Sequence, residues 1–312
     1  MIITLTLNTA LDKTLVMDEL NVGQVNRVKS IRRDAGGKGL LVSKTLSALG
    51  SESVALGIVG GSIGHFILSQ LDELGIANDL VEVNMETRTN LKIIDNKNGT
   101  YTEINEPGAP LHNMVIEEVF YTLQSHVRQG DSVVLAGSLP EGCRENIYAD
   151  MISHCKAEGA KVYLDTEGEP LRIGIEKKPF MIKPNKFELA SLCSCDPEDD
   201  IALLAEAKRL VKTGIEYVLL SLGALGAIFV SKNFTLRARG LNVPVVGRSG
   251  AGDAMTAAMV MAMEKELPPE ECLRFAVASA SAKIMVAGTQ PPEIETVEEL
   301  LPKVVITDMK GL

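Results

Sequence analysis

Short apolar runs alternate along the chain with longer stretches in which apolar residues recur at helical spacing. The short runs predict strands at residues 2–7, 54–59, 132–136, 161–164, 180–182 and 217–221. The longer stretches predict helices at residues 38–49, 62–74, 113–128, 145–158, 186–193, 201–213, 252–265 and 269–287. Strands that are apolar on both faces and separated by helices form a parallel sheet that is covered on both sides. The pattern therefore predicts an α/β fold with a doubly wound, mostly parallel sheet flanked by helices.

Two segments, residues 10–34 and 86–106, break this pattern because polar and apolar residues alternate in them. The second contains Asn98-Gly99 between two strand-like runs, which is a strong hairpin signal. An alternating strand has one face in water or covered by something else. We expect a small sheet that stands off the main one as a lid, a dimer interface or both. No internal repeat or linker divides the chain, so residues 1–312 are predicted to form one domain that carries this lid.

The composition narrows the choice of partners. With 46% hydrophobic and 23% charged residues, the chain is typical of an ordinary folded protein. Its formal net charge of −10 argues against nucleic acid and anionic membranes as partners, because an acidic surface repels both. The N-terminal residues MIITLTLN lack the pattern of a signal peptide, and no apolar run approaches the ~20 residues of a membrane span. A cytoplasmic location is therefore expected.

The five cysteines are odd in number and scattered, which suits reduced thiols. Cys193 and Cys195 have the spacing of a possible metal pair, but no second cluster of Cys or His lies near them in the sequence. A tetrahedral zinc site needs four ligands, so we do not expect a metal role for this pair.

Residues 247–255, GRSGAGDAM, carry the most informative motif. A strand that leads through Gly250, Ala251 and Gly252 into a helix directs several backbone N–H groups and the positive end of the helix dipole at one point. The spacing matches neither the Walker phosphate loop nor the dinucleotide fingerprint. Asp253 would repel a bound phosphate, unless it takes a proton from a hydroxyl that attacks that phosphate. The motif thus predicts phosphoryl transfer to an alcohol, although an acidic helix start explains Asp253 equally well.

A second glycine-rich helix start lies at residues 34–39, DAGGKG. Its glycines allow the backbone to approach a ligand closely, and Lys38 offers positive charge to a phosphate. A plain glycine turn into a helix is the alternative interpretation.

Two later turns can be explained by local structure, and the first also has a functional interpretation. In residues 182–188, Asn185 and Glu188 have the spacing of a capping box, and the same side chains could reach a magnesium-bound water or a nucleotide phosphate. Residues 221–226, SLGALG, have the glycines of a tight hairpin turn.

Taken together, a series of short motifs resembles the PfkB-type carbohydrate kinases of the ribokinase superfamily, in particular the phosphosugar branch with 1-phosphofructokinases and tagatose-6-phosphate kinases. The motifs are NTALD (8–12), GGKG (36–39), TRT (87–89), AGSLP (136–140), LDTEGE (164–169), KPNKFE (183–188), SLGALG (221–226) and GAGD (250–253). The resemblance implies a ribokinase-like fold with a small β-sheet lid, ATP and Mg²⁺ as cofactors, and a homodimer formed through the lid.

The resemblance also implies a role for each matching position. Asp253 would be the base, and the amides of Gly250, Ala251 and Gly252 would hold the transferring phosphoryl group. The residues implied in binding the sugar phosphate are Asp12, Gly37, Lys38, Gly39, Arg88 and Arg27. Those implied in binding ATP are Lys183, Asn185, Ser221, Gly223 and Gly226. Asp165 and Glu188 would act on magnesium, mainly through water.

Two positions depart from the family's pattern. Leu41 stands where the family usually has asparagine, so a hydrogen bond to the sugar worth on the order of 1 kcal/mol is missing. Thr9 stands where the family usually has proline.

The leading hypothesis is ATP-dependent phosphorylation of a ketohexose phosphate. We favour fructose 1-phosphate, giving fructose 1,6-bisphosphate, because residues 87–93 and 102–105 resemble the lid of 1-phosphofructokinases. Tagatose 6-phosphate, giving tagatose 1,6-bisphosphate, is the alternative substrate. A non-catalytic sugar-phosphate sensor on the same fold is a further alternative, and a nicotinamide oxidoreductase, suggested by residues 54–64, is more distant.

Overall fold

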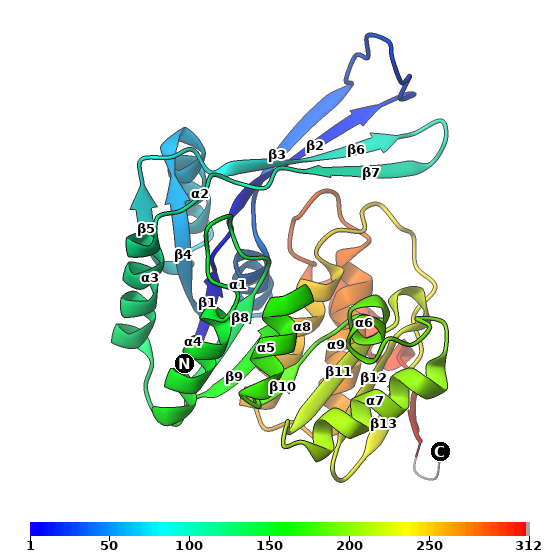
Figure 1. Cartoon of the computed structure of the whole chain (residues 1–312). Coiled ribbons are helices and arrows are strands. Elements are labelled where there is room, and N and C mark those ends of the chain that lie inside the picture. The colour runs from blue at the N-terminus through cyan, green and yellow to red at the C-terminus, as the bar shows by residue number, and fades with distance from the viewer. Residues whose placement is uncertain (310–312) are drawn as a thin grey trace.

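The computed structural model describes residues 1–309 of the chain and contains two sheets (Figure 1). The main sheet has ten strands in the order β14-β13-β12-β11-β10-β9-β8-β1-β4-β5. It is parallel from β5 to β11, while β12, β13 and β14 are added antiparallel. The strands are β1 (Ile2–Thr6), β4 (Val54–Gly60), β5 (Ala77–Val83), β8 (Ser132–Ala136), β9 (Lys161–Asp165), β10 (Met181–Ile182), β11 (Tyr217–Ser221), β12 (Ala227–Ser231), β13 (Thr235–Ala238) and β14 (Ile306–Asp308).

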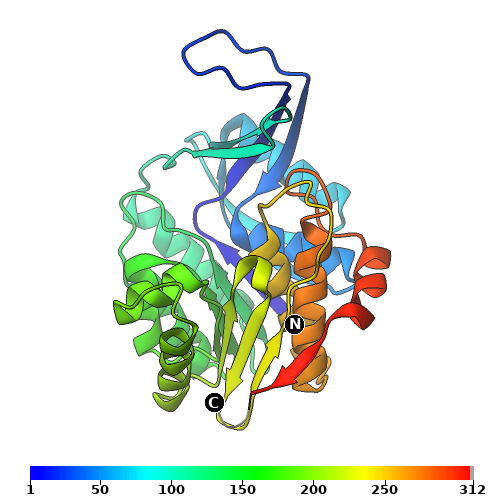
Figure 2. The same cartoon turned by 90° about the vertical axis from the view of Figure 1, so that its right-hand side faces the viewer.

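Helices cover both faces of this sheet, as Figure 2 shows from the side. One apolar core joins the sheet to α3 (Asn113–His126), α4 (Ile147–Ala157), α5 (Gly168–Glu176), α6 (Lys186–Cys193) and α7 (Asp200–Lys212). The core on the other face involves α1 (Lys38–Ala48), α8 (Ala251–Glu264), α9 (Pro269–Lys283) and α10 (Ile294–Leu300). Helix α2 (Gly61–Glu73) packs with α1 in a smaller cluster. The predicted doubly wound α/β fold is confirmed.

The second sheet has four strands in the order β3-β2-β6-β7 and stands over one end of the main sheet (Figure 1). Its strands are β2 (Ala10–Met17), β3 (Ser30–Gly36), β6 (Arg88–Asp95) and β7 (Thr100–Asn105). Strands β6 and β7 form the antiparallel hairpin signalled by Asn98-Gly99, and β2 pairs with β6 in parallel. We call these four strands the lid sheet. That the whole chain forms one domain stays a prediction.

Several elements were missed or misplaced by the sequence pattern. Helix α5 and strands β5, β13 and β14 were not predicted, because they are short or lie at an edge where only part of the strand is buried. The helix predicted over residues 269–287 ends at Lys283 instead. The Ile284 carbonyl accepts hydrogen bonds from the backbone N–H groups of Val246 and Gly247, at 2.8 and 3.1 Å, which ties the residues after α9 to the segment before α8.

The expectation of five reduced thiols is wrong for one pair, because Cys193 and Cys195 form a disulfide. Helix α6 ends at Cys193, and Ser194 adopts the left-handed conformation with φ 52°, which turns Cys195 back towards Cys193. Cys143, Cys155 and Cys272 are free thiols. Within residues 1–309, no helix combines the length and the hydrophobicity that crossing a membrane requires.

Candidate active site

Several predicted site residues lie at the carboxyl ends of the parallel strands, on the side of the main sheet where the lid sheet stands (Figure 1). Asp165 is the last residue of β9, Lys183 follows β10, and Ser221 ends β11. Ligands of open α/β sheets bind outside the carboxyl ends of the strands. This edge of the sheet is therefore the expected place for chemistry.

The start of α8 has the geometry of an anion site. Gly250 is its N-cap, in the left-handed conformation with φ 85°, and no side chain caps the helix. The first N–H groups of a helix have no partner within it, so the amides of this turn are available to a ligand. A Cβ atom at Gly250 would lie 3.0 Å from Lys283 Cε, and one at Gly252 would lie 3.2 Å from Lys183 Nζ. Lysine side chains thus approach both glycines closely, and the positive φ of Gly250 favours glycine there.

Asp253, in the first turn of α8, is a buried carboxylate with a raised pKa. Its side chain is buried, yet no hydrogen bond from the residues described here reaches its carboxylate. Burial, together with the nearby charge of Asp165, raises the pKa of Asp253 to about 6, while Lys38 and Lys183 oppose this rise. A buried carboxylate with a free face and a pKa near neutrality can accept a proton from a substrate hydroxyl.

Asp165 holds two lysines beside this base. Lys38 Nζ lies 2.9 Å from Asp165 Oδ1, and Lys183 Nζ lies 3.0 Å from Oδ2. The Thr256 hydroxyl also donates to Oδ2, at 2.9 Å. Burial alone would raise the pKa of Asp165, but Lys183 and Lys38 outweigh it and hold the pKa well below its usual range. The charges of Asp165, Asp253 and Glu188 raise the pKa of Lys38 despite burial, so Lys38 keeps a positive charge that can neutralise a phosphoryl group.

Asp12 lies on the lid sheet in a polar cluster of its own. Lys92 Nζ lies 2.9 Å from Asp12 Oδ2, and Asn90 Nδ2 donates to Oδ1 at 3.2 Å. Gly36 lies so close that a Cβ atom there would be 2.6 Å from Asp12 Cγ. Asp12, Asn90 and Lys92 are all buried.

Sequence reasoning missed Asn90 and Lys92, although a signal was present. Arg88, Asn90 and Lys92 are two residues apart on β6, and alternate residues of a strand share one face. Asn90 is directly opposite Asp12 in the parallel pairing of β6 with β2. The two-residue spacing of Arg88, Asn90 and Lys92 could have predicted from the sequence that the three side chains share one face of the strand.

The two arginines assigned to the sugar phosphate lie in different surroundings. Arg88 starts β6, and its guanidinium donates to the backbone carbonyls of Glu106 at 2.8 Å and Asn8 at 3.2 Å. Burial lowers the pKa of Arg88, while Asp12 and Glu106 oppose this. Arg27 is exposed in the connection between β2 and β3, which projects beyond the lid sheet (Figure 1). No hydrogen bond or ion pair among the described residues joins Arg27 to the cluster around Asp12, so its role stays a prediction.

A cavity of about 490 Å³ adjoins the start of α8. It is lined by three of the residues predicted to bind ATP, Ser221, Gly223 and Gly226, and by Gly252. Arg248, which is exposed and was not predicted, also lines it. The cavity leads from the hairpin between β11 and β12 to the anion site, as a nucleotide with its phosphates at α8 would require.

The start of α6 has the predicted capping box. Asn185 Oδ1 accepts from the N–H groups of Phe187 and Glu188, each at 2.9 Å, and Glu188 Oε2 accepts from the Asn185 N–H at 2.8 Å. Burial raises the pKa of Glu188, against the charges of Lys38 and Lys183. One Glu188 oxygen is left without a partner among the described residues.

Among residues 1–309, no three His, Cys, Asp or Glu side chains come together as a metal centre. Both Asp165 oxygens are already paired with ammonium groups. Glu188 has a free oxygen, so it fits a magnesium-bound water better than Asp165 does. Mg²⁺ in kinases keeps several waters and binds mainly to phosphates, so contact through water is the expected mode.

The lid sheet also contacts the loop before α8. The hydroxyls of Tyr101 on β7 and Ser249 are 2.8 Å apart, and the Ser249 hydroxyl donates to the Glu103 carboxylate. Ser249 directly precedes Gly250, so the edge of the lid reaches the anion site.

The profile of the pfkB family of carbohydrate kinases matches residues 6–296. The chain belongs to that family. This kinase is 37% identical over 310 residues to the 1-phosphofructokinase of Xanthomonas campestris pv. campestris, with 97% of each chain covered. It is 31% identical over 312 residues to the tagatose-6-phosphate kinase of Staphylococcus epidermidis, covering 99% of this chain and 100% of that one. Phosphofructokinase-2 from Escherichia coli, crystallised with substrates and products, has a TM-score of 0.93 and 26% identity, with 97% of this kinase and 98% of that chain covered.

These comparisons confirm the resemblance and the ribokinase-like fold. Membership of the family indicates that the chain is a sugar-phosphate kinase that uses ATP. The family therefore favours phosphoryl transfer over the nicotinamide oxidoreductase activity. The roles of individual residues rest on the geometry described above.

Proposed function

We propose that this kinase transfers the γ-phosphoryl group of ATP to fructose 1-phosphate and forms fructose 1,6-bisphosphate. The observation that carries the proposal is Asp253, a buried carboxylate without a hydrogen-bond partner among the described residues, in the first turn of an uncapped helix. An anion site beside a free base is what transfer to a hydroxyl requires. The similarity to 1-phosphofructokinases favours fructose 1-phosphate as the acceptor. The 1-phosphofructokinase of Xanthomonas campestris pv. campestris is 37% identical, against 31% for the tagatose-6-phosphate kinase.

In this reaction the sugar's C6 hydroxyl attacks the γ-phosphorus and Asp253 takes its proton. The new O–P bond forms as the bond between the γ-phosphorus and the bridging oxygen breaks, and ADP leaves with that electron pair. The amides of Gly250, Ala251 and Gly252 hold the migrating group, while Lys38 and Lys183 compensate its negative charge. Such preorganised donors are worth about 10²–10³ in rate each.

The sugar phosphate would lie between the lid sheet and the start of α1. Asp12, held by Lys92 and Asn90, faces it from β2, next to the turn of Gly37, Lys38 and Gly39. Arg88, and Arg27 from the projecting connection, would bind its phosphate.

ATP would occupy the cavity lined by Ser221, Gly223 and Gly226, with Asn185 and Lys183 towards its phosphates. Mg²⁺ would be held by those phosphates and, through water, by Glu188. Bound there, it would neutralise part of the charge on the phosphates. Asp165 would organise Lys38 and Lys183 rather than contact the ion.

We also propose a homodimer that forms through the lid sheet. Large apolar side chains are exposed on this sheet and on its projecting connection, namely Val22, Val25, Val28, Ile31 and Ile104. Several exposed large apolar side chains on one part of a protein favour an interaction site there. Sedimentation of wild type and Ile31→Asp tests this, because the charge should shift the kinase to monomers, and an unchanged sedimentation coefficient contradicts a lid dimer. A cytoplasmic location, where ATP and sugar phosphates are found, is proposed as well.

A panel of acceptors in a coupled ADP-release assay tests the substrate. Fructose 1-phosphate should give the largest kcat/KM, followed by tagatose 6-phosphate. Fructose 6-phosphate and unphosphorylated fructose should be poorer. A larger kcat/KM with tagatose 6-phosphate would replace our assignment with the alternative substrate. Binding of a sugar phosphate without any ADP release would support the non-catalytic sensor.

A further inference from the structure

Lys283, the last residue of α9, lies directly beneath the anion site. Its side chain is 2% exposed. A Cβ atom at Gly250 would lie 3.0 Å from Lys283 Cε and 3.8 Å from Cδ, so the lysine stem packs against the backbone that turns into α8. Lys283 Nζ donates to the Gly288 carbonyl at 3.0 Å. No motif assigned a role to this lysine.

The ammonium of Lys283 is buried without an ion pair within the described part of the chain. Gly288 is its one hydrogen-bond acceptor there, although an ammonium has three N–H donors. Burial and the charges of Lys92 and Lys44 lower the pKa of Lys283 to about 8, against Asp34 and Asp253. The group is therefore mostly charged at neutral pH. Burying such a charge destabilises a fold unless something compensates it, so a buried lysine beside the reacting groups points to function.

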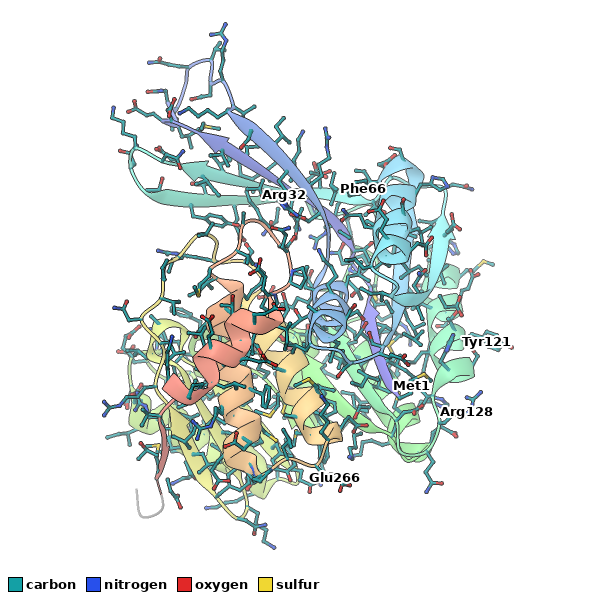
Figure 3. All side chains as sticks on the ribbon, turned by 180° about the vertical axis from the view of Figure 1, so that it is seen from behind. Met1, Arg32, Phe66, Tyr121, Arg128 and Glu266 are labelled. Atoms are coloured by element: carbon teal, nitrogen blue, oxygen red, sulfur yellow. A yellow bond between two sulfur atoms is a disulfide. The ribbon has the colours of Figure 1, made fainter. Side chains whose placement is uncertain are left out.

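The acceptor of this lysine, Gly288, lies against β3 of the lid sheet. A Cβ atom at Gly288 would lie 2.6 Å from Asp34 Oδ2 and 3.1 Å from Arg32 Cδ. Arg32 and Asp34, both on β3, form an ion pair with N–O distances of 2.8 to 2.9 Å. Figure 3 labels Arg32 on the lid sheet. Lys283 thus lies between two segments: the residues after α9 around Gly288, which lie against β3, and the loop that contains Gly250.

We propose that Lys283 is a positioning residue for phosphoryl transfer, which holds the Gly250 turn and adds positive potential behind the amides that bind the migrating group. This rests on transfer of a phosphoryl group at α8 but not on the identity of the sugar. Negative charge grows on that group in the transition state, and a fixed cation in a dry interior stabilises it more strongly than one in water. Lys38 and Lys183 lie beside Asp165 and would contribute positive charge from that side of the site. Lys283 would contribute it from behind the backbone of Gly250.

The chain offers a matched control in Lys44 on α1. Lys44 is also buried, at 3% exposure, and its pKa is also lowered to about 8, mainly by burial. Lys44 Nζ donates to the carbonyls of Ala35 and Thr289, each at 3.0 Å, so it binds the residue next to Gly288. Lys44 does not pack against Gly250. Replacing Lys44 removes a buried ammonium that does not contact Gly250. Its effect on kcat therefore shows what the loss of any buried lysine charge does.

The experiment compares Lys283→Met, Lys283→Gln and Lys44→Met, with the acceptor that the wild type uses best. Lys283→Met should lower kcat by about 100-fold, with KM for the sugar phosphate changed by about three-fold or less. Lys283→Gln keeps a donor for Gly288 but loses the charge, and should lose as much kcat. Lys44→Met should lower kcat by about five-fold or less at a comparable fall in Tm. In Lys283→Ala, added ethylammonium should restore part of kcat.

The proposal is overturned if Lys283→Gln keeps kcat within about three-fold of wild type, or if Lys44→Met loses as much kcat as Lys283→Met at equal Tm. If Lys283→Met does not fold, Lys283→Gln and the ethylammonium rescue decide the question. A wild type that rejects fructose 1-phosphate but uses another sugar contradicts the substrate assignment and leaves this test intact. If no sugar is accepted, the rate of ATP hydrolysis by water is measured in the variants in place of kcat. Hydrolysis uses the same anion site, so the same comparison applies.

Discussion

Two helices in this kinase begin with a carboxylate in the same position, and they use it differently. Helix α6 begins after Asn185 and carries Glu188 three residues on, while α8 begins after Gly250 and carries Asp253 three residues on. In α6 the Asn185 side chain and Glu188 form a capping box. In α8 no side chain caps the helix, and Asp253 accepts no hydrogen bond from the described residues.

The comparison shows that the same spacing of residues at a helix start can be closed by a side-chain cap or left open to a ligand. A capped helix start has used most of the hydrogen-bonding capacity of its first turn, so it stabilises the helix, and in α6 one Glu188 oxygen is left for a ligand. An uncapped start keeps its N–H groups and its carboxylate for a ligand and forgoes that stabilisation. The predictions below test this difference between α6 and α8, from the largest expected effect to the smallest.

Asp253→Asn should have the largest effect. The amide has nearly the same shape but cannot take a proton, so kcat should fall by about 10³-fold or more while ATP still binds. Glu188→Gln, at the matching position of α6, should lower kcat by about ten-fold. Steady-state kinetics and calorimetric titration with ATP measure both. Equal losses in the two variants would contradict the distinction between the two carboxylates.

Gly252→Ala tests the open backbone of α8. A Cβ atom at this position would lie 3.2 Å from Lys183 Nζ, so Lys183 must shift from its place beside Asp165. Misplacing one charged donor should lower kcat by about 30-fold. The control is Phe187→Ala at the matching position of α6, where the side chain is 62% exposed and kcat should change by less than about two-fold. A Gly252→Ala enzyme with wild-type kcat would show that the close approach is not needed.

The pH dependence of kcat/KM should report the environment of Asp253. Its pKa is raised to about 6 by burial and by Asp165, against Lys38, Lys183 and Lys92. The ionised form is the base, so activity should be lost as the pH falls through this pKa, by about ten-fold between pH 7 and pH 5. The residual activity of Asp253→Asn should lack this acid limb. A limb near the ordinary pKa of aspartate would contradict the proposed surroundings.

Asn185→Ala should have the smallest effect on the molecule as a whole. Loss of the cap leaves two N–H groups of α6 without their acceptor and should lower the free energy of unfolding by about 1 kcal/mol. Asn185→Asp keeps an acceptor and should be less destabilised. Urea denaturation measures both variants. An unchanged midpoint for Asn185→Ala would mean that the cap adds nothing measurable to stability.

Much of the fold and part of the site could be predicted from the sequence, because their signals are local. The alternation of apolar runs with helical stretches predicted the covered parallel sheet, and Asn98-Gly99 predicted the hairpin of the lid sheet. The spacing of Asn185 and Glu188 predicted a capping box within a single turn. The glycines before Asp253 predicted a helix start that directs its N–H groups at one point, since each signal spans only a few residues.

The partners of the charged residues were decided only by the tertiary structure. Lys38 meets Asp165 across 127 positions of sequence, and Asn90 meets Asp12 across 78. Lys283 reaches Gly250 because α9 packs beside α8 and its last turn opens towards Gly288. Such contacts depend on which strands and helices become neighbours, and no local pattern encodes that choice. The sequence by itself therefore determined the elements and the kind of chemistry, while the packing of distant elements determined which carboxylate is left without a hydrogen-bond partner among the described residues.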